Sequence, residues 1–156
     1  MAIGNASVAE SPPSLGDGLG SLGDIVGLHL RLAHNAVYRH FMESLAHLDL
    51  TQKQTSVLWL IDENPGIAQI DLAARLGMDR ATMMAIIDRL EAREILTRNR
   101  SKRDRRRQDL HLTEAGKEVL TDARAAVGQH EAWLKGRIGD EADVADFVEG
   151  LMRIYR

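Results

Sequence analysis

The chain has 156 residues, of which 44% are hydrophobic, and this is enough to bury the core of one domain. It contains no cysteine, which excludes disulfides, thiolate metal ligands and thiol-based redox sensing and fits the reducing cytoplasm expected for it. The net charge of −3 hides a basic cluster, because residues 98–107 carry seven Lys or Arg side chains and one Asp on an otherwise acidic chain.

The first part of the chain is predicted to be an arm followed by a long helix. Residues 1–23 are rich in Ser, Gly and Pro, which favours a flexible arm. They carry no Lys or Arg and no long apolar run, so we expect neither a signal peptide nor a membrane span. From Asp24, as N-cap, to Leu48 the pattern predicts a helix that is apolar on most sides. Such a helix needs cover on most sides, so we expect a second subunit against it.

Two helices joined by a sharp turn are predicted next. Thr51 and Gln54 have the spacing of a capping box at the start of a helix that ends at an Asn-Pro-Gly sequence. A short helix then runs to about Leu76, after which Gly77 supplies a left-handed C-cap and Asp79 the next N-cap. Because so few residues separate the short helix from the helix that follows Asp79, these two helices must cross steeply, as in a helix-turn-helix unit.

The helix that begins at Asp79 is predicted to have an apolar inner face and a contrasting outer face. The inner positions follow the i, i+3, i+4, i+7 spacing: Met83, Ile86, Ile87 and Leu90. The outer positions carry Ala81, Met84, Ala85 and Asp88, with Arg80 and Arg89 at the borders.

A β-hairpin is predicted around the basic cluster. Residues 95–100 and 108–112 are expected to form its two strands, and in the second strand Leu110 and Leu112 alternate with polar residues. The basic cluster therefore lies at the tip of the hairpin.

Two further helices complete the chain. A long helix is predicted to begin at Thr113, and a last one follows Gly139-Asp140 and carries an apolar stripe. We expect this stripe and the first helix to form the interface of a homodimer. The predicted interface residues are Ile25, Leu28, Leu32, Phe147, Leu151 and Ile154.

A steep helix pair followed by a basic hairpin is typical of a winged helix-turn-helix that binds duplex DNA. The second helix fits the major groove, and a cationic hairpin reaches phosphates or the adjacent minor groove. We therefore expect a mainly α fold with a small β-hairpin wing, in which residues 24–156 form one domain: dimerisation helices at 24–48 and 114–156 flank a DNA-binding part at 51–113. The predicted DNA-binding residues are Arg80, Ala81, Thr82, Met84, Ala85, Arg89, Arg98, Lys102, Arg103, Arg105, Arg106 and Arg107.

Over about residues 25–155 the sequence resembles the MarR (multiple antibiotic resistance regulator) family. The matching stretches are Leu72-Ala73-Ala74-Arg75-Leu76-Gly77, Ile87-Asp88-Arg89-Leu90-Glu91, and Asp104-Arg105-Arg106 followed by Leu110-His111-Leu112-Thr113-Glu114-Ala115-Gly116. The resemblance implies dimers on pseudo-palindromic operators, usually as repressors, with a ligand cleft between the dimerisation and DNA-binding regions. It also implies that Arg106 enters the minor groove and that Asp104 supports the structure of the wing.

The recognition helix departs from the family in one respect. Members often have a hydrogen-bonding or cationic residue where this chain has Met84 and Ala85. We therefore expect Met84 and Ala81 to touch thymine methyl groups, leaving Arg80, Thr82 and Arg89 for polar and phosphate contacts.

A small-molecule effector is expected in a cleft between the first helix and the helix that starts after Thr51. Cationic and aromatic groups beside an apolar cleft favour an organic anion, and the resemblance points to an aromatic carboxylic acid or its coenzyme A thioester. The candidate ligand-binding residues are Arg31, His34, Asn35, Tyr38, Arg39 and Trp59.

Other classes of function remain as alternatives. The sequence has no G-x-S-x-G, Walker A or H-E-x-x-H motif and no cysteine nucleophile, so we expect neither an enzyme nor a cofactor. A metal-responsive regulator stays open, because the predicted first helix carries His29, His34, His40 and His47. A winged helix that binds RNA or another protein is the remaining alternative.

Overall fold

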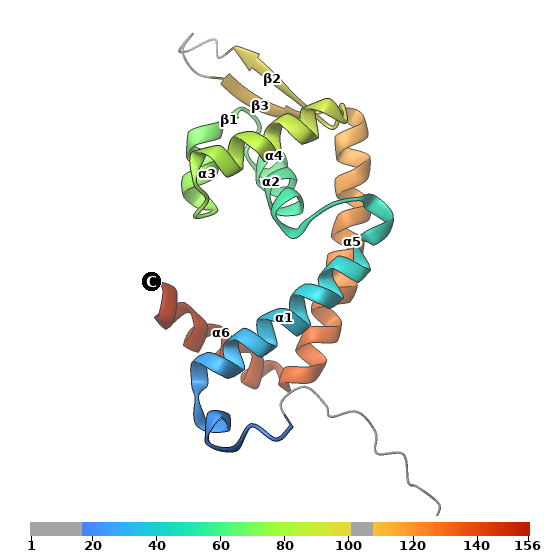
Figure 1. The fold of residues 1–156 in the computed structure, drawn as a ribbon. Helices are drawn as coiled ribbons and strands as arrows, with labels where there is room; N and C mark the ends of the chain where they lie inside the picture. Colours follow the sequence, from blue (N-terminus) through green and yellow to red (C-terminus); the bar gives the residue numbers. More distant parts are fainter. Residues whose placement is uncertain (1–16, 101–107) are drawn as a thin grey trace, which may run out of the picture. The chain divides into compact units, whose positions relative to one another are not determined.

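The computed structural model describes residues 17–100 and 108–156, which divide into two compact units, one ending at Val37 and the other starting at Tyr38. The first unit contains a 3-10 helix, η1 (Gly20–Asp24), and the beginning of helix α1 (Val26–Ser44), which continues into the second unit (Figure 1). The second unit contains the remaining elements.

The single helix predicted from Asp24 to Leu48 is divided in the structure. Helix α1 is preceded by η1 and followed by a second 3-10 helix, η2 (Ala46–Leu48). The prediction that Asp24 is the N-cap of this helix is wrong, because Asp24 is the last residue of η1. At the other end, the Ser44 hydroxyl donates to the His40 carbonyl at 2.8 Å, a bond that competes with the helix ladder where α1 ends.

The helix-turn-helix unit is confirmed. It consists of α2 (Gln52–Glu63), α3 (Gln69–Arg75) and α4 (Arg80–Ala92). The capping box is present, with Thr51 N–H donating to Gln54 Oε1 at 2.8 Å and Gln54 N–H donating to Thr51 Oγ1 at 3.3 Å. Gly77 has the left-handed conformation predicted for it, with φ of 60°. The four predicted inner residues of α4 are all buried: Met83, Ile86, Ile87 and Leu90.

The hairpin is also confirmed, and it belongs to a three-stranded antiparallel sheet with the order β1-β3-β2. Strands β2 (Leu96–Arg100) and β3 (Gln108–Leu112) lie side by side (Figure 1). Strand β1 (Ile67–Ala68) was not predicted, because two residues are too few to show a period. It pairs Ile67 with Leu110, whose side chain is fully buried.

Helices α5 (Glu114–Ile138) and α6 (Glu141–Tyr155) complete the second unit. Helix α5 starts where it was predicted to, and Thr113 caps it, accepting from Gly116 N–H at 3.0 Å. Helix α6 packs on α5 yet has no buried residue, and Phe147 and Ile154 remain 43% and 67% exposed. None of the helices in the described ranges is long and apolar enough to cross a membrane.

Candidate nucleic-acid interface and effector cavity

The outer face of α4 is open at the surface of the second unit. Ala81, Met84 and Ala85 are exposed, Met84 by 50%, as the sequence predicted. Arg80 and Arg89 border this face, and neither forms an ion pair with another described residue. The face therefore combines a small apolar surface with two exposed cations that no described acidic residue pairs with. This combination suits base-edge and phosphate contacts.

The N-terminus of α4 is held by Asp79. Its carboxylate accepts from the Thr82 N–H at 2.8 Å and from the Thr82 hydroxyl at 2.6 Å. These two hydrogen bonds hold the pKa of the Asp79 carboxyl below its usual value. Asp79 is thus a charged N-cap at neutral pH, and it fixes the first turn of the helix that carries Arg80 and Ala81.

Arg98 on the wing strand β2 is directed to α4. Its guanidinium forms an ion pair and hydrogen bond with the Asp88 carboxylate, and its Nε lies 3.1 Å from Glu91 Oε2. The Arg98 side chain is 19% exposed, whereas its two acidic partners are about half exposed at 56% and 43%. Arg98 therefore connects the wing to the recognition helix within the protein, a contact that its predicted DNA-binding role did not include.

The tip of the wing lies outside the described residues. The predictions for Lys102, Arg103, Asp104 and residues 105–107 therefore remain sequence-based. The strands that carry the tip are described, and β2 pairs with β3 along its whole length, from Leu96–Leu112 to Arg100–Gln108.

A cavity of about 460 Å³ lies between α1, α2, α3 and α5 in the second unit. Its apolar wall includes Phe41, Trp59, Leu60, Leu76 and Val127, and its polar lining includes Gln52, Thr55, Ser56 and Arg75. The Trp59 indole is oriented by a hydrogen bond to Glu63 Oε1 at 2.7 Å and by the Arg124 guanidinium, 4.8 Å from its ring centre. The size and mixed lining are those of a small-molecule site.

Arg75 is the cation of this cavity. Its Nη1 donates to Asn64 Oδ1 at 2.9 Å, which fixes the side chain through a neutral partner. None of the ion pairs between described residues involves Arg75. Arg75 was not among the predicted ligand-binding residues, because the cations of the site were expected on the first helix. It lies, however, in one of the stretches that carry the family resemblance.

The predicted ligand-binding residues are only partly brought together. Trp59 lines the cavity, whereas Tyr38 and Arg39 are exposed and are not among its lining residues. Arg31, His34 and Asn35 belong to the first unit, and their role stays a prediction.

The histidines of α1 do not form a metal site in the described structure. His40 contacts His130 of α5, with their Nδ1 atoms 2.8 Å apart. Among the described residues, no group of three or more His, Asp or Glu side chains has a geometry that suits a metal ion.

Comparison with known proteins identifies the family. Residues 50–107 match the model of the MarR family. A putative transcriptional regulatory protein for the hcr operon of Thauera aromatica is 30% identical over 88% of this chain and 82% of its own length. The chain belongs to the MarR family. It is a transcriptional regulator with the winged-helix fold that the sequence predicted, and its relatives are regulators rather than enzymes.

Solved structures support the same assignment for this MarR-family chain. The transcriptional repressor CouR bound to a 23-mer DNA duplex is 35% identical, with a TM-score of 0.83 over 88% of this chain and 97% of CouR. CouR bound to p-coumaroyl-CoA is 33% identical, with a TM-score of 0.81 over 90% of this chain and 98% of CouR.

Proposed function

We propose that this protein is a cytoplasmic repressor that binds a pseudo-palindromic DNA operator as a homodimer and is released by a small organic anion. The observation that carries the proposal is the open face of α4, which lies beside a hairpin whose tip has the basic cluster. CouR, which shares this fold at 35% identity, was solved on a DNA duplex. A long helix with one free face fits the major groove, and the wing reaches the neighbouring backbone and minor groove.

The roles in DNA binding follow from the chemistry of each surface. Ala81, Met84 and Ala85 offer apolar contacts to thymine methyl groups, while Arg80 and Arg89 suit phosphates. The Thr82 hydroxyl donates a hydrogen bond to the Asp79 carboxylate. Thr82 therefore helps to orient the first turn of α4 and also offers polar contacts to DNA. In the wing, Arg106 is proposed to enter the minor groove, and Asp104 to support the structure of the wing. The residues proposed to contact backbone phosphates are Lys102, Arg103, Arg105 and Arg107.

Dimerisation is proposed through α6 together with the first helix. Phe147 and Ile154 on α6 and Ile25 in the first unit are all more than 40% exposed in the single chain. Exposed apolar stripes of this kind are buried in stable oligomers. Leu28, Leu32 and Leu151, each half-buried, extend the same proposed interface.

The effector site is proposed to be the cavity of about 460 Å³ that contains Trp59 and Arg75. An aromatic acid, or its coenzyme A thioester, would place its ring against the aromatic and aliphatic wall and its charge near Arg75. CouR was also solved with p-coumaroyl-CoA, a ligand of this class. Ligand binding would release DNA by favouring the form with the lower DNA affinity.

The nucleic-acid part is tested by measuring binding to duplex DNA, single-stranded DNA and RNA of one sequence under one salt condition. We expect duplex DNA to bind most tightly. Equal or tighter binding of RNA would favour the RNA-binding alternative and overturn the proposal.

The effector part is tested by screening aromatic acids and acyl thioesters for ligands that raise the Tm and weaken DNA binding. We expect Arg75→Gln to reduce the affinity for such a ligand about tenfold, since a charge-assisted contact is lost, without changing DNA binding of the free protein. The matched control, Lys117→Gln, removes an exposed cation that pairs with Glu114 and should respond like wild type. A response only to divalent metals would instead favour the metal-sensing alternative.

A further inference from the structure

The recognition helix ends in a turn of defined geometry. Glu94 has a φ of 59°, its N–H donates to the Glu91 carbonyl at 2.8 Å, and the Ile95 N–H donates to the Leu90 carbonyl at 3.2 Å. This pair of bonds is a Schellman motif, in which Arg93 is the C-cap. Ile95 and Leu90 are both buried, so the turn is fixed by packing as well as by hydrogen bonds. We call residues 93–95 the α4 turn.

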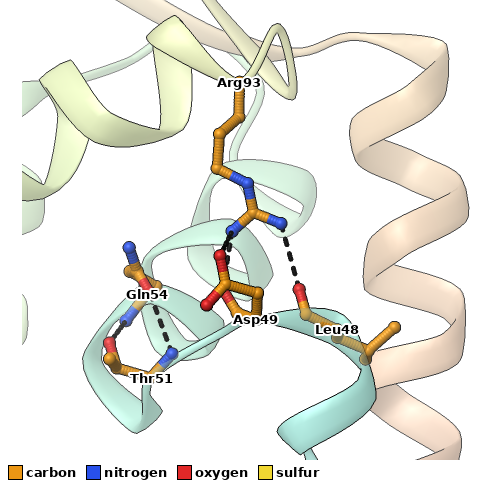
Figure 2. Close-up of polar contacts among 5 residues, drawn as sticks. All are labelled: Leu48, Asp49, Thr51, Gln54 and Arg93. Atoms are coloured by element: carbon orange, nitrogen blue, oxygen red, sulfur yellow. Dashed lines mark hydrogen bonds and ion pairs between the residues drawn. The ribbon is translucent and has the colours of Figure 1, made fainter.

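Arg93 attaches the α4 turn to the chain that leaves α1. Its Nη1 donates to the Asp49 carbonyl at 2.6 Å and its Nη2 to the Leu48 carbonyl at 3.0 Å, as Figure 2 shows. Leu48 is the last residue of η2 and Asp49 is its left-handed C-cap, so these carbonyls lie at a helix C-terminus, where a cation is favourable. The Asp49 carboxylate is farther away, with Oδ2 3.9 Å from Nη1, and contributes less.

The same turn is attached to the start of α5. The Thr113 hydroxyl donates to the Glu94 carbonyl at 2.7 Å, and the Thr113 N–H donates to the Ile95 carbonyl at 3.2 Å. Gly116 lies so close that a Cβ there would be 1.9 Å from the Ile95 carbonyl oxygen. One turn of three residues therefore joins the recognition helix to the end of α1 and to the beginning of α5, the helix that leads to α6.

We infer that Arg93 is a positioning residue for DNA recognition, which sets the orientation of α4 relative to the end of α1 and to α5, the helix that leads to the proposed dimer interface on α6. The inference rests on the proposed function, because orientation matters only if two recognition helices must meet two half-sites at once. Successive major grooves are about 34–36 Å apart, and moving one half-site by a base pair shifts it by about 3.4 Å and rotates it by about 35°. A rigid α4 turn makes the dimer intolerant of that change. Without Arg93, the α4 turn keeps its attachment to α5 but loses its attachment to the end of α1, and the tolerance widens.

The experiment uses the full chain and the best duplex selected from a randomised pool, together with duplexes in which the half-sites are one base pair closer or farther apart. Affinity and its salt dependence are measured for wild type, Arg93→Gln, Arg93→Lys and Asp49→Asn. The last is a matched control, because it keeps both carbonyl acceptors and places at φ 50° a residue that tolerates this conformation.

We expect Arg93→Gln to bind the best duplex about tenfold more weakly, as the loss of charge-assisted bonds predicts, and to discriminate among the three spacings at least about threefold less than wild type. Arg93→Lys should be intermediate, and Asp49→Asn should match wild type. The slope of affinity against salt should stay unchanged, since Arg93 is not a phosphate contact.

Unchanged discrimination among the spacings in Arg93→Gln would show that Arg93 has no positioning role and would overturn the inference. A salt slope reduced by about one unit would also overturn it, because Arg93 would then be a phosphate contact. If Arg93→Gln does not fold, the same comparison with Arg93→Lys decides. Failure of wild type to prefer any duplex would overturn the proposed function itself, whereas selective binding by wild type with unaltered spacing preference in the variants overturns the positioning role alone.

Discussion

His40 of α1 and His130 of α5 share a hydrogen bond between their Nδ1 atoms, which are 2.8 Å apart. One Nδ1 must donate and the other accept, so at least one ring of the pair is neutral. His130 is 2% exposed, and its ring packs in a T-shaped arrangement with the ring of Phe41, which also lines the cavity. His40 stacks on Trp133 with ring centres 3.8 Å apart. The pair thus forms a buried polar contact between two helices next to the proposed effector site.

This contact predicts that stability decreases at acidic pH. Burial lowers the pKa of His130 below its usual 6.5 and the nearby His40 lowers it further, although Glu131 acts in the opposite direction. The unfolded chain therefore binds this proton more readily, and stability present above pH 6.5 is lost as the pH falls through 6.5 towards the lower folded pKa. One proton contributes at most about 1.4 kcal/mol per pH unit.

Denaturant unfolding at pH 7.5 and 5.5 measures this effect. His130→Gln, which does not titrate, should show a smaller loss between the two pH values than wild type. His47→Gln, a change at an exposed histidine, should keep the wild-type loss. Equal losses in wild type and His130→Gln would rule out His130 as the source.

The wing is expected to depend on Arg98 for its attachment to α4. Arg98→Gln removes the ion pairs with Asp88 and Glu91 and should destabilise the fold by about 1 kcal/mol, because both acids are half exposed and solvent screens the pairs. A double-mutant cycle with Glu91→Gln should give a coupling energy of about 0.5–1 kcal/mol in chemical denaturation. Strictly additive effects would show that Arg98 and Glu91 do not interact in solution.

Glu94 is expected to be a site where glycine stabilises the protein. Its φ of 59° is unfavourable for a residue with a side chain, and a Schellman turn usually has glycine at this position. Glu94→Gly should raise the free energy of unfolding by a few tenths up to about 1 kcal/mol, after the entropy of glycine in the unfolded chain is subtracted. Glu94→Ala keeps the strained conformation and should give no such gain. A similar gain from alanine would point to the charge of Glu94 as the cause.

The proposed dimer predicts a specific effect at Leu151. Leu151→Asp places a charge in the α6 interface and should weaken the dimer at least about tenfold, as seen by sedimentation velocity. Ile70→Asp is the matched control, because Ile70 is an exposed apolar residue, 58% accessible, on α3. Dissociation caused by both substitutions, or by neither, would contradict the assignment of the interface to α6.

Much of the fold could be predicted because each helix end carries its own local signal. The capping residues Thr51, Asp79 and Thr113 act within three residues of sequence, and Gly77 occupies the left-handed position that favours glycine. The end of α1 gave no such signal. After α1 and η2 the chain turns at Asp49, a non-glycine residue with positive φ. The Asp49 carbonyl is bound by Arg93, which is distant in the sequence.

The site was harder to predict than the fold, because its contacts join residues far apart in sequence. Residues on the outer face of α4 were identified from helical period alone. By contrast, Arg75 is held by a hydrogen bond to Asn64, Arg98 pairs with Asp88 on α4, and His40 contacts His130. The periodic pattern of a helix or strand does not reveal such pairs. Composition identified the basic residues but not which of them pair within the protein.

The central claim is tested most directly by selecting duplexes from a randomised pool with the wild-type protein and sequencing those that are enriched. The account predicts an inverted repeat whose half-sites are centred about 10 base pairs, or one helical turn, apart, with two subunits bound per duplex. Arg106→Ala should bind the selected duplex more weakly by about 1–3 kcal/mol. Enrichment of a single half-site, or of no sequence at all, would contradict a dimeric operator-binding repressor.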